Sequence, residues 1–272
     1  MKTTHHNVLS TGLQWLRRSS TKLRRPLLCL TVFLLITSLG YGGQPDAHAL
    51  VARTDLALRG KTQQGKASMT VRTPDWQRTL EMDYWSVNPD KSFILITSPA
   101  KEAGTSTLRL KSNMWNYLPK VERVIKIPPS LMLQPWMGSD FTNDDLVKES
   151  SLVNDYTHKI VGEVVEGGDA CYQVLATPKP DAPVVWGKLV LAIRKSDSLP
   201  RKEEFYDEKG KLRKVLTYED IRNAGGRNYP MRWKMVSVTK PGHETVLVYS
   251  DLKFDQRIPN RIFTQRNMKR PY

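Results

Sequence analysis

The chain has 272 residues, of which 42 are Lys or Arg and 27 are Asp or Glu, and its formal net charge is +15. This length is enough for a domain with a substantial hydrophobic core. Such an excess of positive charge attracts anionic partners, namely nucleic acid, membrane headgroups or acidic proteins. The sequence contains no βαβ alternation, no internal repeat and no low-complexity block.

Residues 1–49 predict a cleaved secretory signal peptide. A basic run at 17–25 precedes the apolar stretch 27–41, and Ala47-His48-Ala49 fits an A-x-A cleavage site. The apolar run is shorter than the roughly 20 residues that a membrane-spanning helix needs, so we expect cleavage after Ala49 rather than an anchor. The remaining residues, 50–272, are expected to form one domain with a formal charge of +10, because the leader takes away six basic residues and one acidic residue. Export makes nucleic acid the least suitable anionic partner.

The predicted elements begin with a helix over 50–59, which ends before Gly60. Short runs rich in β-branched and aromatic residues then alternate with turn residues, which indicates an all-β domain. In 78–85, Leu80, Met82 and Tyr84 fall on one face, so the sheet is antiparallel with one apolar face. The predicted strands are 66–72, 78–85, 91–97, 105–111, 113–118, 123–127, 158–165, 171–177, 187–193, 200–206, 212–218, 231–235 and 244–249.

The segment 127–151 is the one long insert without strand character, and we expect it to cover the apolar face. Its acids, Asp140, Asp144, Asp145 and Glu149, lack the alternation and the internal glycine of a calcium-binding loop. Thr142-x-x-Asp145 instead matches a capping box loosely, so the acids are expected mainly to start a helix and not to bind metal. The predicted fold is therefore an incomplete antiparallel β-barrel, a half-barrel meander with a helical lid.

The apolar half of this segment leaves two interpretations open. Prolines at 128, 129 and 135 limit it to short turns, and its side chains either pack in an ordinary core or form a lid over a cavity that accepts acyl chains. Flexible methionines favour the second interpretation modestly. The candidate ligand-binding residues from the lid and the strand faces are Leu80, Met82, Leu131, Met132, Trp136, Met137, Met231, Trp233 and Met235.

Arg78 shares the parity of Leu80 and Met82, so its side chain is expected inward near a strand end. It either rests at the mouth with its guanidinium in water or donates to lid carbonyls or a lipid headgroup. The candidate residues for holding or gating the lid are Arg78, Pro128, Pro129, Gly138 and Asp140.

Catalytic signals are weak. His158 and His243, the histidines beyond the leader, stand in separate predicted strand starts, and no zinc, nucleophile-elbow or phosphate-loop motif is found. Cys171, the one cysteine after the leader, is expected to be buried and inert. We therefore expect a protein that is not an enzyme and has neither cofactor nor metal.

Several stretches resemble the outer-membrane lipoprotein-sorting, or LolA-like, family of the bacterial periplasm. They are "MTVRTPDWQRTLEMDYW", "ITSPAKEAGTSTLRL", "MWNYLPKVERVIKIPPS", "WMGSDFTNDDLVKESS", "TPKPDAPVVWGKLVL" and "EEFYDEKGKLRKVLTYEDI". The resemblance implies an incomplete β-barrel whose helical lid covers an apolar cavity and is held by an inward arginine, for which Arg78 is the matching position.

For function, the resemblance implies a soluble periplasmic carrier that moves lipid or lipoprotein acyl chains between membranes. Its expected partners are an inner-membrane transporter, an outer-membrane acceptor and, transiently, an anionic membrane surface. The same fold also serves periplasmic sensors, so the alternative is a sensor or accessory subunit that docks onto an inner-membrane transporter or regulator.

Overall fold

The structure, a computed structural model, describes residues 44–147, 151–182 and 184–269, and its compact unit spans Gln44–Tyr272. The predicted leader falls mostly on residues 1–43, outside the described residues, and stays a prediction. Helix α1 (Ala47–Arg59) begins three residues before the predicted start. The Asp46 side chain caps it by accepting a hydrogen bond from the Ala49 amide at 2.7 Å. None of the helices in the described ranges is long and apolar enough to cross a membrane.

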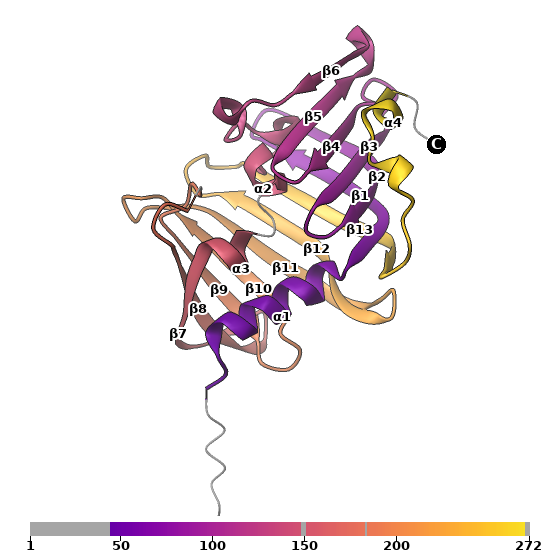
Figure 1. The fold of residues 1–272 in the computed structure, drawn as a ribbon. Helices are drawn as coiled ribbons and strands as arrows, with labels where there is room; N and C mark the ends of the chain where they lie inside the picture. Colours follow the sequence, from indigo (N-terminus) through magenta and orange to yellow (C-terminus); the bar gives the residue numbers. More distant parts are fainter. Residues whose placement is uncertain (1–43, 148–150, 183, 270–272) are drawn as a thin grey trace, which may run out of the picture. The chain divides into compact units, whose positions relative to one another are not determined.

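Thirteen strands form one antiparallel sheet, and each corresponds to a predicted strand (Figure 1). The order is β6-β5-β4-β3-β2-β1-β13-β12-β11-β10-β9-β8-β7. The sheet is open, so the prediction of an incomplete barrel is confirmed. The strands are β1 (Thr62–Arg72), β2 (Gln77–Val87), β3 (Lys91–Ser98), β4 (Ser106–Leu110), β5 (Asn113–Leu118), β6 (Arg123–Lys126), β7 (Tyr156–Glu166), β8 (Asp169–Pro178), β9 (Lys188–Arg194), β10 (Pro200–Tyr206), β11 (Leu212–Ala224), β12 (Arg227–Ser237) and β13 (Glu244–Phe254).

Two meanders make this sheet. Strands β1 to β6 run in chain order toward one edge, and β7 to β13 run in chain order from the other edge inward. The meanders join in the middle, where β1 pairs with β13 over the register Gln63↔Phe254 to Arg72↔Glu244. The edge strands β6 and β7 are consecutive in sequence, so the chain between them has to cross from one edge of the sheet to the other.

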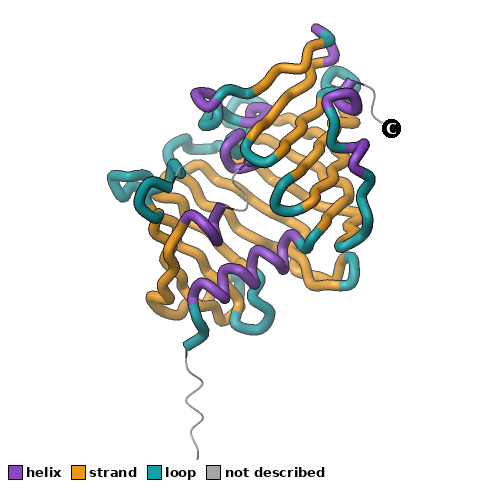
Figure 2. Tube along the Cα trace, viewed as in Figure 1, coloured by secondary structure: helices purple, strands orange, loops and turns teal. Residues whose placement is uncertain are grey.

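That crossing segment contains four short helices: η2 (Pro129–Leu131), η3 (Trp136–Gly138), α2 (Asn143–Val147) and α3 (Ser151–Asp155). Midway, the Asp140 amide contacts the Thr245 hydroxyl of the central strand β13. Helix α1 packs against α3 and β7, and α1, α2 and α3 gather on one side of the sheet (Figure 2). The prediction that 127–151 supplies a helical lid is thus confirmed in its position, although proline breaks it into single turns.

The opposite face is covered over β3 to β5 by the C-terminal segment, which contains the short 3-10 helix η4 (Asn260–Ile262) and the short helix α4 (Gln265–Lys269). Ile258, Phe263 and Met268 pack with Phe93 and Leu108 in a separate buried cluster. Consequently, the first four residues of β4 are all buried rather than alternately buried and exposed, because both faces of this strand are covered.

Strands β11 and β12 extend beyond their predicted ends. The run 219–223 contains a single apolar residue, Ile221, which is too little alternation to extend the predicted strand 212–218. The turn itself consists of Gly225 and Gly226, with φ of +58° and +84°, as a two-residue hairpin with both central residues at positive φ requires. A β-carbon on Gly225 would also stand 2.8 Å from the Leu252 carbonyl oxygen.

Candidate functional site

Two adjoining cavities lie between the sheet and the helices. The first, cavity 1, has a volume of about 170 Å³, and the second, cavity 2, about 100 Å³. Cavity 1 is walled by α1, the lid segment and β9 to β13, whereas cavity 2 reaches toward β1 to β5. Seven residues line both, namely Leu58, Arg59, Trp136, Leu146, Trp233, Leu247 and Tyr249.

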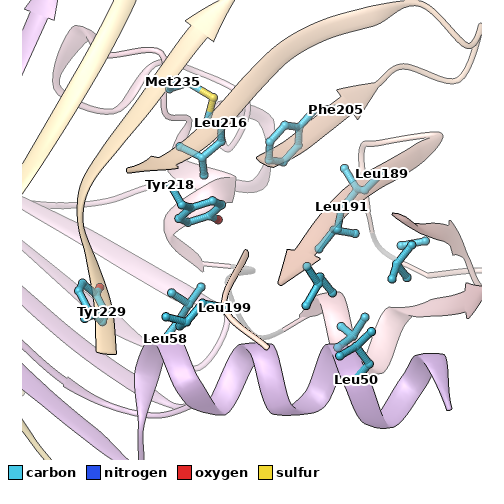
Figure 3. Packing of buried hydrophobic residues seen from close by; sticks show 14 of the residues in the cluster. Leu50, Leu58, Leu189, Leu191, Leu199, Phe205, Leu216, Tyr218, Tyr229 and Met235 are labelled. Carbon is cyan, nitrogen blue, oxygen red and sulfur yellow. The ribbon is translucent and has the colours of Figure 1, made fainter. Parts of the chain in front are cut away.

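Alternation along the strands supplies the wall of cavity 1. Leu189 and Leu191 in β9 and Leu216 and Tyr218 in β11 stand two residues apart, so each pair projects to the same face of the sheet. Figure 3 shows these side chains together with Leu58 from α1. The same period brings Trp233 and Met235 of β12 to the cavity. This part of the cavity wall is therefore apolar, because the alternation of the strands places these side chains on one face of the sheet.

Trp136 combines the features of the two interpretations that the sequence left open for the lid. Its side chain is 3% exposed and packs with Met69, Leu80 and Met82. At the same time it lines both cavities. The indole Nε1 donates a hydrogen bond to the Thr107 hydroxyl at 3.1 Å, which satisfies the polar atom of a buried tryptophan.

Arg78 and Thr245 of the sheet make two of the polar contacts that hold the lid. Arg78 points to the lid and donates a hydrogen bond to the Met137 carbonyl oxygen, while its guanidinium also lies 3.4 Å from Glu102. The Asp140 amide donates to the Thr245 hydroxyl at 2.9 Å, and this hydroxyl donates to the Asp140 carboxylate at 2.8 Å. Met137 and Gly138 have positive φ values of +50° and +72°, which turn the lid carbonyl toward Arg78.

The acids of the lid do more than start a helix. The capping box is confirmed: the Asp145 carboxylate accepts from the Thr142 amide at 2.7 Å, and the Thr142 hydroxyl accepts from the Asp145 amide at 3.1 Å. However, Asp144 and Asp145 also line cavity 1, and Asp145 contacts the buried Lys214 of β11 at 2.5 Å. Their position corrects the expectation that these acids serve mainly as caps.

Sequence reasoning missed a carboxyl group inside the cavity. Glu203 in β10 lines cavity 1, and its Oε2 accepts a hydrogen bond from the Tyr218 hydroxyl at 3.0 Å. Burial raises the pKa of Glu203 to about 7, against the opposing effect of the Tyr218 hydrogen bond. Burial and the Glu203 charge also raise the pKa of Tyr218. The available signal was parity, because Glu203 shares the face of Phe205, which also lines the cavity.

The other predicted ligand-binding residues are divided among the cavities, the core and the surface. Trp233 and Met235 line cavity 1, and Met82 lines cavity 2. Met132 packs against the cluster that contains Trp136. The remaining candidates depart from the prediction that they line the cavity: Leu80 and Met231 are buried in the core, Met137 borders an outer groove beside Arg78, and Leu131 is 44% exposed.

Of the predicted lid residues, Arg78, Gly138 and Asp140 are at the fastening points described above. Pro128 and Pro129 are exposed at the start of η2, where Pro128 is the residue before the helix. They position the lid without touching either cavity.

Within residues 44–147, 151–182 and 184–269, no three His, Cys, Asp or Glu side chains are arranged to hold a metal ion. Cys171 is buried, and burial raises the pKa of its thiol, which makes it a poor nucleophile. His158 hydrogen-bonds the Leu152 carbonyl oxygen through Nε2 at 2.9 Å, on the edge strand β7.

A protein-family model, described only as a family of uncharacterized proteins, matches residues 88–270. The chain belongs to that family. No curated protein sequence matches the chain.

Solved structures agree with this membership. A DUF1329 family protein from Desulfovibrio piger is 24% identical, with a TM-score of 0.76 over 82% of this chain and 100% of its own. A putative outer membrane lipoprotein-sorting protein domain from Vibrio parahaemolyticus is 23% identical, with a TM-score of 0.73 over 82% of this chain and 98% of its own. A LolA superfamily protein from Nitrosomonas europaea is 25% identical, with a TM-score of 0.69 over 82% of this chain and 99% of its own. The resemblance to LolA-like proteins drawn from the sequence motifs is confirmed.

Proposed function

We propose that the protein is a periplasmic, non-catalytic carrier that holds the acyl chain of a lipid or lipoprotein in the cavities beneath the lid and moves it between membranes. The observation that carries the proposal is the pair of apolar-walled cavities between the open sheet and the lid. The LolA-like fold and the predicted leader support the location.

The cavity volumes indicate that the lid has to move. A cavity of about 150 Å³ binds a molecule of benzene's size, so cavity 1, at about 170 Å³, holds only part of an acyl chain while the lid is closed. The lid is attached through few polar contacts, among them those made by Arg78 and Asp140. Each methylene buried after opening contributes about 0.8 kcal/mol, so a single chain supplies enough free energy to displace it.

Lipid extraction from protein isolated from the bacterial periplasm, followed by mass spectrometry, tests the proposal. We expect bound acyl-chain lipid, and we expect the emptied protein to take up the uncharged dye N-phenyl-1-naphthylamine with a saturable rise in fluorescence. A preparation that carries no lipid and takes up no dye would refute the carrier.

A second candidate, an accessory subunit that docks onto an inner-membrane transporter or regulator, is favoured by one surface feature. Leu118, Val121 and Ile125 are 38%, 56% and 43% exposed around the edge strand β6. An unpaired strand edge with apolar residues is a surface to which another chain can add. Cross-linking of this edge to a membrane protein in cells, in a variant whose cavities bind no dye, would favour this function over the carrier.

A further inference from the structure

Glu203 faces the interior of cavity 1 from the middle of strand β10. Glu203 stands between Leu191 of β9 and Leu216 of β11, which are its partners in the two neighbouring strands. Its hydrogen-bond partner among the described residues is the Tyr218 hydroxyl. Glu203 keeps part of its surface accessible although it faces inward, as expected for a side chain that borders an unfilled cavity.

Negative groups outnumber positive groups around this cavity. Arg59 is the cation that lines it, among the residues that the structure describes, and it pairs with Asp55 at 2.6 Å. Lys214 adds a second cation through its contact with Asp145. When Glu203 is ionised, four carboxylates thus face two cations, and an anionic group placed in the cavity would meet a net negative charge at low dielectric. The carboxylates that line cavity 1 are those of Asp55, Asp144, Asp145 and Glu203.

We propose that cavity 1 binds amphiphiles with an uncharged, hydrogen-bond-donating polar end more tightly than amphiphiles that end in a carboxylate. The hydroxyl of a fatty alcohol or of an acylglycerol is such an uncharged end. This inference deepens the proposed carrier function and rests on it. The apolar wall takes the chain, and Glu203 accepts the hydroxyl proton in a hydrogen bond. A carboxyl group can accept this bond in either of its protonation states. A ligand carboxylate offers no proton to Glu203 and is repelled by it when Glu203 is ionised.

Several other titratable or charged groups face Glu203, so its charge is one of several that a ligand encounters. Tyr218 keeps its proton at neutral pH, because burial and Glu203 raise its pKa, and Tyr156 does so for the same reasons. The groups that face Glu203 are Asp55 and Arg59 from α1, Asp144 and Asp145 from α2, Tyr156 from β7, and Lys214 and Tyr218 from β11.

Displacement of N-phenyl-1-naphthylamine by 1-decanol and by decanoate, two ligands of equal chain length, tests the selection. A charged end weakens binding to any apolar cavity, so the decisive quantity is the change in decanoate affinity that Glu203→Gln causes. At pH 8 we expect Glu203→Gln to strengthen decanoate binding about tenfold and to leave decanol binding within about threefold. The matched control is Glu204→Gln, since the Glu204 carboxylate contacts Lys202 and Tyr206 and does not line the cavity.

The pH dependence gives a second readout. A ligand carboxylate with an ordinary pKa stays ionised at pH 6, where Glu203 is largely protonated, so decanoate should compete better with the wild-type protein at pH 6 than at pH 8. This gain should disappear in Glu203→Gln and persist in Glu204→Gln. Decanoate binding that is equal in all three proteins at both pH values would overturn the selection and leave the carrier function intact. Failure of the wild-type protein to bind dye, decanol and decanoate would instead count against the carrier function itself.

Discussion

At the scale of single residues, the side chains that face the cavities fall into two groups, those that the sequence predicts and one that it does not. Met82, Trp233 and Met235 could be placed on the inward face from the sequence, because large apolar side chains at the parity of a buried face have few other locations, whereas Trp136 lies in the lid, outside any strand. Glu203 shares the parity of Phe205, but it was not predicted there, because a glutamate in a strand ordinarily marks the solvent face. Glu203 faces inward beside a cavity, and part of the wall of this cavity comes from helices α1 and α2, which are distant from Glu203 in sequence.

Removal of the Trp136 side chain should join the two cavities, because the indole lines both. We expect Trp136→Ala to lower the free energy of unfolding by about 3–5 kcal/mol and to raise the affinity for longer apolar chains relative to shorter ones. Urea unfolding and dye displacement by alcohols of increasing length measure the two effects. Trp136→Phe, which keeps most of the volume and loses the Thr107 hydrogen bond, should keep the wild-type length preference; a shift equal to that of Trp136→Ala would contradict this role.

Glu203 should make stability depend on pH. Its folded-state pKa of about 7 lies above the ordinary 4.5, so its protonated form favours folding below pH 4.5, and this contribution is lost as the pH rises through 7. At about 1.4 kcal/mol per pKa unit, the loss is at most about 3 kcal/mol. Urea unfolding at pH 5 and pH 8 should therefore show a smaller decrease in Glu203→Gln than in the wild-type protein. Glu204→Gln serves as the control, and a decrease of the same size in all three proteins would argue against a buried Glu203.

At the scale of elements, the strands could be predicted from the sequence, whereas the C-terminal segment that covers one face of the sheet could not. Every strand with apolar–polar alternation was found near its true bounds, whereas the ends of β11 and β12 next to their shared turn were missed, because their few apolar residues, such as Ile221 and Tyr229, stand among polar and turn residues. The C-terminal cover over β3 to β5 has no periodic pattern, so only the structure shows why β4 is buried on both faces.

The lid helix α2 depends on its capping box. Thr142→Ala removes the hydroxyl that accepts from the Asp145 amide, and we expect the free energy of unfolding to fall by about 1 kcal/mol. Thr142→Ser retains the oxygen and should restore most of this loss. If urea unfolding shows equal stabilities for the Ala and Ser variants, the cap contributes nothing.

At the scale of the whole molecule, the lid is the one segment that joins the two sheet edges, and it is pinned at the central strand by Asp140 and Thr245. A disulfide between cysteines at these two positions should therefore hold the lid closed. We expect the oxidised Asp140→Cys/Thr245→Cys variant to take up dye at least tenfold more slowly, and reduction to restore the rate. The single-cysteine variants are the controls, and Cys171 does not interfere because it is fully buried. Uptake at the wild-type rate in the cross-linked protein would show that ligands enter without lid movement.

The pairing of β1 with β13 has a kinetic consequence. Partners such as Gln63 and Phe254 are separated by most of the domain, and contacts of such long sequence separation form late because the loop entropy must be lost first. Each meander can assemble from local hairpins, but β1 can pair with β13 only after β13, the last strand, has been synthesised. The two halves of the sheet therefore remain unpaired until the synthesis of the chain is nearly complete.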